Sequence, residues 1–241
     1  MVVPMDDHHR VCLLLAAWND HGYRTRHQLA RLLADRGIAS VMLENPLYGD
    51  RRAEPTDDRP LATVSDFAIM GRAAVVEGRS LADHLHRQGY RVGAAGYSMG
   101  GNLAAFIGSM VPFPMAVAPA ASPHAAGPAF LHGVLRLSVA WDAIDPDPQQ
   151  ARDRLSDFLH AASVLDWDPP GHLTAAVLVA GTVDGFVPTA SVQAIHRHWP
   201  GSRMEWVTAG HASLLWRNKD RLADAIENSF RLLDELEREG G

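Results

Sequence analysis

The sequence contains almost no lysine and almost no cysteine. Its 241 residues include 22 basic side chains, of which only Lys219 is a lysine, and the single cysteine is Cys12. One cysteine excludes an intramolecular disulfide and a cysteine-rich zinc site. Cys12 lies inside the apolar run VCLLLAAW, so we interpret it as a small buried side chain of a strand.

Long basic runs and long apolar runs are missing as well. The net charge is −6 with histidine neutral and the arginines are scattered, which argues against a nucleic-acid partner. The apolar run that follows MVVPMDDHHR has eight residues before Asn19, too few for a transmembrane segment and poorly matched to a signal peptide. We therefore expect a soluble, cytoplasmic protein.

The 13 histidines do not form a metal-binding pattern. A structural or catalytic metal site requires several ligands at suitable spacing. The pair His8-His9 is not accompanied by a carboxylate–histidine cluster at such spacing elsewhere in the chain. The sequence therefore predicts neither a metal nor another cofactor.

What the sequence does contain is a regular alternation of short apolar runs and longer helical patterns. Because strands alternate with helices, we predict a single α/β domain over residues 1–241, with a mostly parallel sheet and helices on both faces. All carboxyl ends of such strands lie at one edge, where ligands bind. The predicted strands are residues 11–17, 38–44, 91–97, 114–120, 175–181 and 203–208, and the predicted helices are 24–36, 61–88, 102–110, 189–198 and 222–239.

Residues 123–172 interrupt this alternation because they contain no apolar run typical of a sheet strand. Two stretches, 129–141 and 152–167, carry apolar residues at helical spacing, among them Leu135 and Phe158. A long insertion beside the carboxyl edge of a sheet is typical of a lid, so we predict a helical lid with Leu135 and Phe158 facing a substrate pocket. The alternative is a helical excursion that only packs on the sheet.

The motif GYSMGG at residues 96–101 places a serine between glycines. It fits G-x-S-x-G, and Ser98 follows a predicted strand and precedes a helix, as a nucleophile elbow requires. The glycines remove side chains where strand and helix approach closely. The N–H of Met99, at the start of that helix, can then serve as one of the two donors of an oxyanion hole.

A nucleophilic serine needs a base, and the base needs an orienting acid. Asp184 in GTVDGFVP and His211 in TAGHASL each follow a predicted strand. The chain order Ser98, Asp184, His211 is the order expected in this architecture. Asp142 and Asp145 are rival acids, although both belong to the predicted lid.

These residues carry a resemblance to the α/β-hydrolase superfamily over nearly the whole chain. The runs LLLAAWNDHGYRTRHQLA, SVMLENPLYGDRR and GYSMGGNLA are similar to the branch of α/β-hydrolase domain-containing protein 18. The resemblance implies a minimal α/β-hydrolase fold of about six strands and a serine hydrolase with Ser98, Asp184 and His211 as its triad. Many superfamily members have His-Gly where this chain has Ala16-Ala17, and the second oxyanion donor is then the N–H of Trp18.

Other polar residues near the same edge have less specific interpretations. Asp20 and His21 follow the first strand and either line the pocket or stabilise the loop. Tyr48 is a further pocket candidate, although we expect Glu44, Asn45 and Tyr48 to hold their loop in place.

The activity expected from these observations is hydrolysis of carboxylic esters or thioesters, including lipid esters, through an acyl-enzyme. The expected partner is a small ester with an apolar acyl group. An acyltransferase or peptidase on the same triad, or a binding protein that retained the fold, remain as alternatives. Neither the acyl chain, the leaving group nor the oligomeric state follows from the sequence.

Overall fold

A parallel sheet of six strands, in the order β2-β1-β3-β4-β5-β6, runs through the part of the chain that the structure describes. The computed structural model describes residues 1–4, 9–52, 61 and 63–240, so His8 and part of the loop after Asn45 lie outside it. The sheet confirms the predicted α/β fold. Its strands are β1 (Arg10–Leu15), β2 (Ile38–Met42), β3 (Arg91–Tyr97), β4 (Ala116–Ala120), β5 (Val177–Gly181) and β6 (Arg203–Val207).

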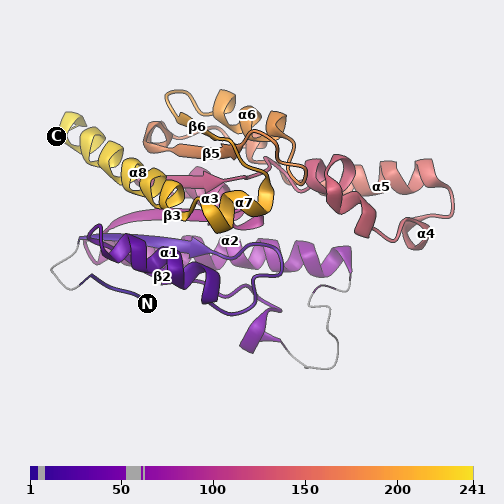
Figure 1. Ribbon diagram of the computed structural model, residues 1–241, viewed down its shortest axis with the longest axis horizontal. Coiled ribbons are helices and arrows are strands. Elements are labelled where there is room, and N and C mark those ends of the chain that lie inside the picture. Colours follow the sequence, from indigo (N-terminus) through magenta and orange to yellow (C-terminus); the bar gives the residue numbers. More distant parts are fainter. Residues whose placement is uncertain (5–8, 53–60, 62, 241) are drawn as a thin grey trace.

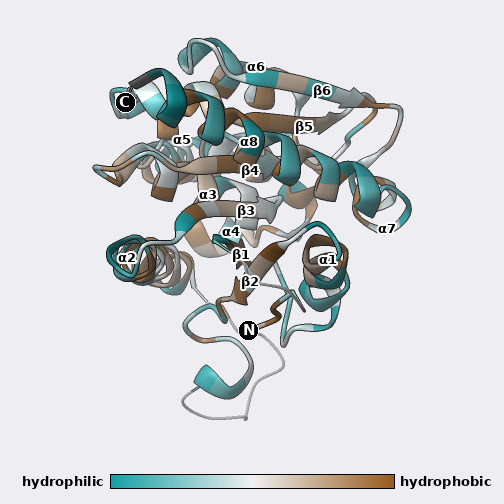
Figure 2. Ribbon diagram, turned by 90° about the vertical axis from the view of Figure 1, so that its left-hand side faces the viewer, coloured by the Kyte–Doolittle hydropathy of each residue, from teal (hydrophilic) through white to brown (hydrophobic). Residues whose placement is uncertain are grey.

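Helices cover both faces of the sheet. The main helices are α1 (Arg24–Ala34), α2 (Val64–Arg87), α3 (Met99–Met110), α6 (Thr189–His198), α7 (His211–Arg217) and α8 (Lys219–Gly240). Alternate residues of β1 face opposite layers, as expected for a strand. Leu13 and Leu15 pack with α2 and α3, whereas Cys12 and Leu14 pack with α1 and α8. Figure 2 shows α1 and α2 on opposite sides of β1 and β2. Burial on both faces explains why these strands read as continuous apolar runs.

Local signals in the sequence account for several element boundaries. The Thr63 side chain accepts a bond from the Asp66 N–H while the Asp66 carboxylate accepts one from the Thr63 N–H, and this capping box begins α2. Gly37, with φ +73°, follows α1 in a left-handed conformation. Gly78 lies inside α2 because a Cβ there would come within 2.4 Å of the Ile107 side chain on α3.

Two boundaries near the predicted site differ from the expectation. α3 begins at Met99 rather than at residue 102, since the glycines after Ser98 are helical. α7 was not predicted, and it begins at His211 itself. A helix of seven residues is too short for apolar periodicity to reveal it.

The segment 123–172 connects β4 to β5 without contributing a strand to the sheet. Its α-helices are α4 (Trp141–Ile144) and α5 (Pro148–His160), which lie beyond the end of the sheet in Figure 1. The stretch 129–141 is not one continuous helix, because Gly133 is extended and separates the short turns 128–132 and 134–138. Leu131, Leu155 and Leu159 form a small core of their own.

Candidate active site

Ser98 occupies a sharp turn between β3 and α3. Its φ of 56° and ψ of −120° are unusual for a residue with a side chain. The Ser98 N–H donates to the Ala120 carbonyl on β4 at 2.8 Å. Neighbouring structure therefore holds this backbone in a strained conformation, which is a frequent property of functional sites.

The glycines around Ser98 are required by close approaches of the backbone. A Cβ on Gly96 would lie 2.3 Å from the Gly100 carbonyl, and a Cβ on Gly100 would lie 2.4 Å from the Leu15 carbonyl. Gly101 is similarly close to the Ala120 carbonyl, at 2.9 Å. Side chains at these positions would push α3 away from β1, β3 and β4. The glycine-rich motif thus serves the geometry of the turn that carries Ser98.

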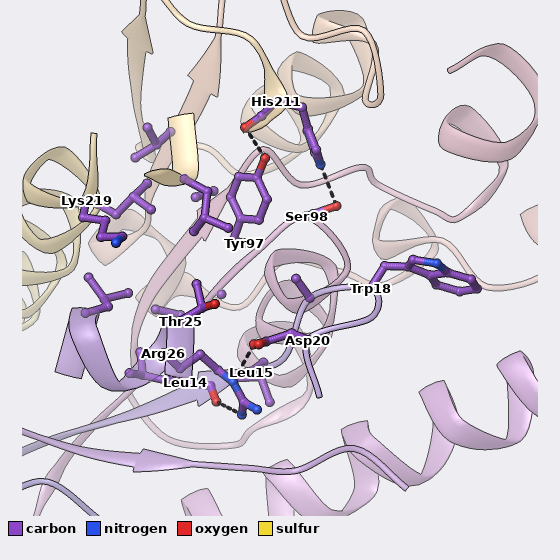
Figure 3. Close-up of a pocket in the computed structure, with 18 of the residues that line it drawn as sticks. Leu14, Leu15, Trp18, Asp20, Thr25, Arg26, Tyr97, Ser98, His211 and Lys219 are labelled. Carbon is purple, nitrogen blue, oxygen red and sulfur yellow. Dashed lines mark hydrogen bonds and ion pairs between the residues drawn. The ribbon is translucent and has the colours of Figure 1, made fainter. Parts of the chain in front are cut away.

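Three side chains from three loops meet above the sheet edge. His211 Nε2 lies 3.0 Å from Ser98 Oγ, and His211 Nδ1 lies 2.6 Å from Asp184 Oδ2. Figure 3 shows the imidazole of His211 directed at Ser98. The structure therefore brings together the three residues that the sequence placed at separate strand ends. Asp142 and Asp145 lie in and next to α4.

Both oxygens of the Asp184 carboxylate have hydrogen-bond partners. Its Oδ1 accepts from the N–H groups of Phe186 and Val187 at 2.8 and 2.9 Å, while Oδ2 faces His211. Its side chain is 3% exposed, and that of His211 is 11% exposed. Such a carboxylate can accept a hydrogen bond from Nδ1–H and fix the tautomer that leaves Nε2 free to accept a proton.

Two aromatic residues fix the His211 ring from its sides. The Phe186 ring stacks on it with centroids 4.9 Å apart and planes 16° apart, and the Tyr97 ring lies 4.8 Å away. The Tyr97 hydroxyl also donates to the His211 carbonyl. Burial, and secondarily the negative charge of Asp184, raise the pKa of Tyr97, so this hydroxyl stays a donor. Sequence reasoning missed both residues, although each stands beside a motif that it identified.

Two backbone N–H groups near Ser98 have no acceptor among the described residues. One belongs to Met99, the first residue of α3, and the other to Trp18, in the loop after β1. The Trp18 side chain packs against the rings of Phe67 and Phe130. Figure 3 shows Trp18 and Ser98 on the same side of the cavity.

The loop that carries Trp18 is anchored by Arg26. This side chain on α1 is buried and donates to Asp20 Oδ2 at 2.8 Å, to the Gly22 carbonyl at 2.6 Å and to the carbonyls of Leu14 and Leu43. Burial raises the pKa of Asp20, and the Arg26 guanidinium opposes that rise. Asp20 thus borders the cavity while its charge is committed to Arg26. No sequence motif pointed to Arg26.

Three of the predicted pocket residues do not line the cavity. Tyr48 is fully buried against Met70 and Met99, and its hydroxyl accepts from the Asn19 N–H at 3.3 Å. His21 is exposed and packs on the Tyr48 ring. Phe158 is 44% exposed on α5, because the other face of that helix packs into the small core of the segment. Tyr48 therefore supports the loop, as the alternative interpretation held.

A cavity of about 330 Å³ is lined by Ser98, His211 and Trp18, among other residues. Its volume is within the range of small-molecule sites. We call the part lined by Ser98, Trp18, Ala129, Leu135 and Phe186 the front of the cavity. The rest lies between the sheet and α8. Within the described residues no three His, Cys, Asp or Glu side chains form a group that could hold a metal ion, and none of the described helices is long and apolar enough to span a membrane.

The sheet order, the serine turn and the hydrogen-bonded Ser98, His211 and Asp184 define an α/β hydrolase. More narrowly, the family model described as "Alpha/beta hydrolase domain containing 18" matches residues 1–168 and 147–232. The chain belongs to this family.

Solved structures show the same fold at low sequence identity. TT1662 from Thermus thermophilus is 18% identical, with a TM-score of 0.67 over 96% of this chain and 91% of the other. The Pyrococcus furiosus esterase Pf2001 is 16% identical, with a TM-score of 0.60 over 93% and 82%. Est1E from Butyrivibrio proteoclasticus is 15% identical, with a TM-score of 0.59 over 94% and 90%. Identities this low establish the shared fold and leave the substrate open.

Proposed function

We propose that the protein is a serine hydrolase that cleaves carboxylic esters through an acyl-enzyme. The observation that carries this proposal is the continuous hydrogen-bonded series Ser98 Oγ, His211 Nε2 and Nδ1, and Asp184 Oδ2, with separations of 3.0 and 2.6 Å. A serine, a base within hydrogen-bond reach and an acid that orients the base are the parts of an activated nucleophile. The Pyrococcus furiosus esterase Pf2001, which has a similar fold, agrees with this reaction class.

In the proposed first half-reaction, Ser98 Oγ attacks the ester carbonyl carbon. His211 Nε2 takes the Oγ proton, and the imidazolium then gives this proton to the departing alcohol oxygen. Asp184 stabilises the imidazolium and holds the ring. The N–H groups of Met99 and Trp18 donate to the oxyanion of the tetrahedral intermediate.

In the second half-reaction, water attacks the carbonyl carbon of the acyl group bound to Ser98 Oγ. His211 removes a proton from that water and returns it to Ser98 Oγ as the acid product leaves. The reaction needs no cofactor, because each proton removed is returned within one turnover. The substrate is a small ester with an apolar part.

We further propose that the segment 123–172 serves as a lid within a single domain. Ala129 and Leu135 supply its contribution to the cavity wall. The Val134 N–H donates to the Gly185 carbonyl at 3.0 Å, which joins the segment to the loop of Asp184. Gly133 passes so near that a Cβ there would lie 1.9 Å from the Phe186 carbonyl.

A fluorophosphonate probe and an ester panel test the proposed reaction together. Ser98→Ala should lose probe labelling and lower kcat for ester hydrolysis by about 10⁴-fold or more. Ser109→Ala, on the same helix and remote from His211, is the matched control and should retain both. Ester turnover by Ser98→Ala at the wild-type rate would contradict the proposal. Product analysis with an added alcohol or amine would reveal acyl transfer instead of hydrolysis.

A further inference from the structure

The same cavity includes a part between the sheet and α8, here called the rear arm. It is lined by Leu14, Ala95 and Ala118 from the sheet, by Leu222 and Ala225 from α8, and by Lys219. In the view of Figure 3, Tyr97 lies between Ser98 and Lys219. One cavity thus joins the nucleophile to the only lysine of the sequence.

Small side chains create the rear arm. Leu14, Ala95 and Ala118 stand in register on three neighbouring strands and form its floor. Ala225 faces the same layer from α8. Larger side chains at the alanine positions would fill the space between sheet and helix. Apart from Lys219, the side chains named here as lining the rear arm are apolar, which suits a hydrocarbon chain.

Lys219 differs from the rest of this lining because it is charged and has no counter-ion among the described residues. Its Nζ donates to the Gln28 side-chain carbonyl on α1, a neutral partner. No carboxylate of the described residues forms an ion pair with it, whereas the other charged groups of the cavity, Asp20 and Arg26, neutralise each other. An ammonium has three donors, so Lys219 can bind an anion while keeping Gln28.

The end of the rear arm at Lys219 is open to water. Lys219 is half-buried and Trp216 beside the cavity is 70% exposed, whereas the floor residues are buried. An anion placed there keeps part of its hydration and avoids most of the cost of burying a charge. The cavity therefore offers an apolar channel with a cation at a hydrated end.

We propose that the rear arm binds the acyl group of the substrate and that Lys219 selects acyl groups with a carboxylate at their distal end. This inference rests on the proposed ester hydrolysis at Ser98. The substrate class is then the half-ester of a medium-chain dicarboxylic acid, with the ester carbonyl at Ser98 and the free carboxylate at Lys219.

Steady-state kinetics with paired substrates test this assignment. The monomethyl ester of octanedioic acid is compared with methyl octanoate, and the comparison is repeated with shorter and longer homologues. In the wild type, kcat/KM should favour the carboxylated ester at one or more chain lengths. Lys219→Met should reduce that preference by about tenfold, the lower end for a hydrogen bond to a charged group at a partly exposed site. Lys219→Glu should reverse it.

Two control variants separate recognition from structure. Arg221→Met removes a neighbouring cation of α8 that faces Glu205 and does not line the cavity. Gln28→Ala removes the bridge from α1 but keeps the ammonium. Both should retain the preference. An equal loss for both substrates in Lys219→Met would show that Lys219 only holds α8 to α1, and would overturn the inference.

The remaining outcomes are equally decisive. Hydrolysis of methyl octanoate without any preference for carboxylated esters would overturn the role of Lys219 and leave the proposed reaction intact. A preference that follows a carboxylate on the alcohol rather than on the acyl group would overturn the assignment of the rear arm. Absence of both ester turnover and Ser98 labelling would instead refute the proposed function.

Discussion

Arg26 Nε lies 2.8 Å from Asp20 Oδ2, and this ion pair connects α1 to the loop that presents the Trp18 N–H. Both side chains are largely removed from solvent, with 6% and 13% exposure. The remaining donors of Arg26 bond the backbone carbonyls of Gly22 in the same loop, of Leu14 in β1 and of Leu43, the residue after β2. One side chain therefore fixes the loop that begins at Ala16-Ala17.

Removing Arg26 should destabilise the protein strongly. Arg26→Met leaves the Asp20 charge and several carbonyls without a partner, a change that costs about 3–5 kcal/mol when a buried pair is broken. Urea unfolding monitored by circular dichroism measures it. Asp20→Asn is the matched control and should cost less, because Arg26 keeps its carbonyl acceptors. An Arg26→Met variant as stable as the wild type would contradict this role.

Substitution of Asp184 should disable catalysis while the fold survives. Asp184→Asn can still accept the N–H groups of Phe186 and Val187, but it favours the wrong tautomer of His211. We expect kcat to fall by about 10⁴-fold with an unchanged circular dichroism spectrum. Asp142→Asn, which changes the rival acid on α4, should have wild-type kinetics. If the Asp142 variant were the inactive one, the assignment of the acid would be wrong.

In the proposed lid segment, Leu135 should influence the preference for the alcohol part of the substrate, whereas Phe158 should not. Leu135 lines the front of the cavity and Phe158 does not. With the acyl group in the rear arm, Leu135→Asn should lower kcat/KM for a hexyl ester relative to the methyl ester of the same acid. The loss should be about 4- to 15-fold, equivalent to one or two buried CH₂ groups. Phe158→Asn should leave this ratio unchanged, and equal effects of the two variants would refute the placement.

Acid should weaken the protein partly through His172. Its Nε2 lies 3.0 Å from the Gly108 carbonyl in the last turn of α3, and burial lowers its pKa from the ordinary 6.5, with the bond to Gly108 opposing the shift. The folded state thus favours the neutral ring, so the contribution of His172 is full above pH 6.5 and is lost as the pH falls below it.

The comparison of His172→Gln with the wild type isolates this effect. The amide can still donate to the Gly108 carbonyl but does not titrate. We expect the melting temperature of the wild type, taken relative to the variant, to decline between about pH 7 and pH 5. Other histidines, such as His124, contribute to both proteins and cancel in the difference. A constant difference across this range would show that His172 does not titrate differently on folding.

The sequence was sufficient for the fold because its signals are local. Six apolar runs of strand length and the intervening helical patterns determine a parallel sheet, and the structure confirms it. The three residues Ser98, Asp184 and His211 could also be predicted from the sequence, since each comes shortly after a strand. All three then meet at the same edge by topology alone.

Residues that act through tertiary contacts were not accessible in this way. Arg26 looks like any arginine of an amphipathic helix until β1, β2 and the next loop surround it. Helical spacing in residues 152–167 identified an apolar face but not its partner, and that face packs into the segment itself, leaving Phe158 outside. Gly133 interrupts the other stretch because the loop of Asp184 passes against its backbone.

The alanine floor of the cavity has a consequence for how such an enzyme changes over generations. Ala95 and Ala118 lie within the strands, whereas Ser98, Asp184 and His211 lie beyond their ends. If the rear arm holds the acyl group as proposed, chain-length preference and bond cleavage depend on separate positions. One substitution of alanine by a bulkier residue would then shorten the acceptable acyl chain without changing a reacting residue, so substrate range could drift while the chemistry stays the same.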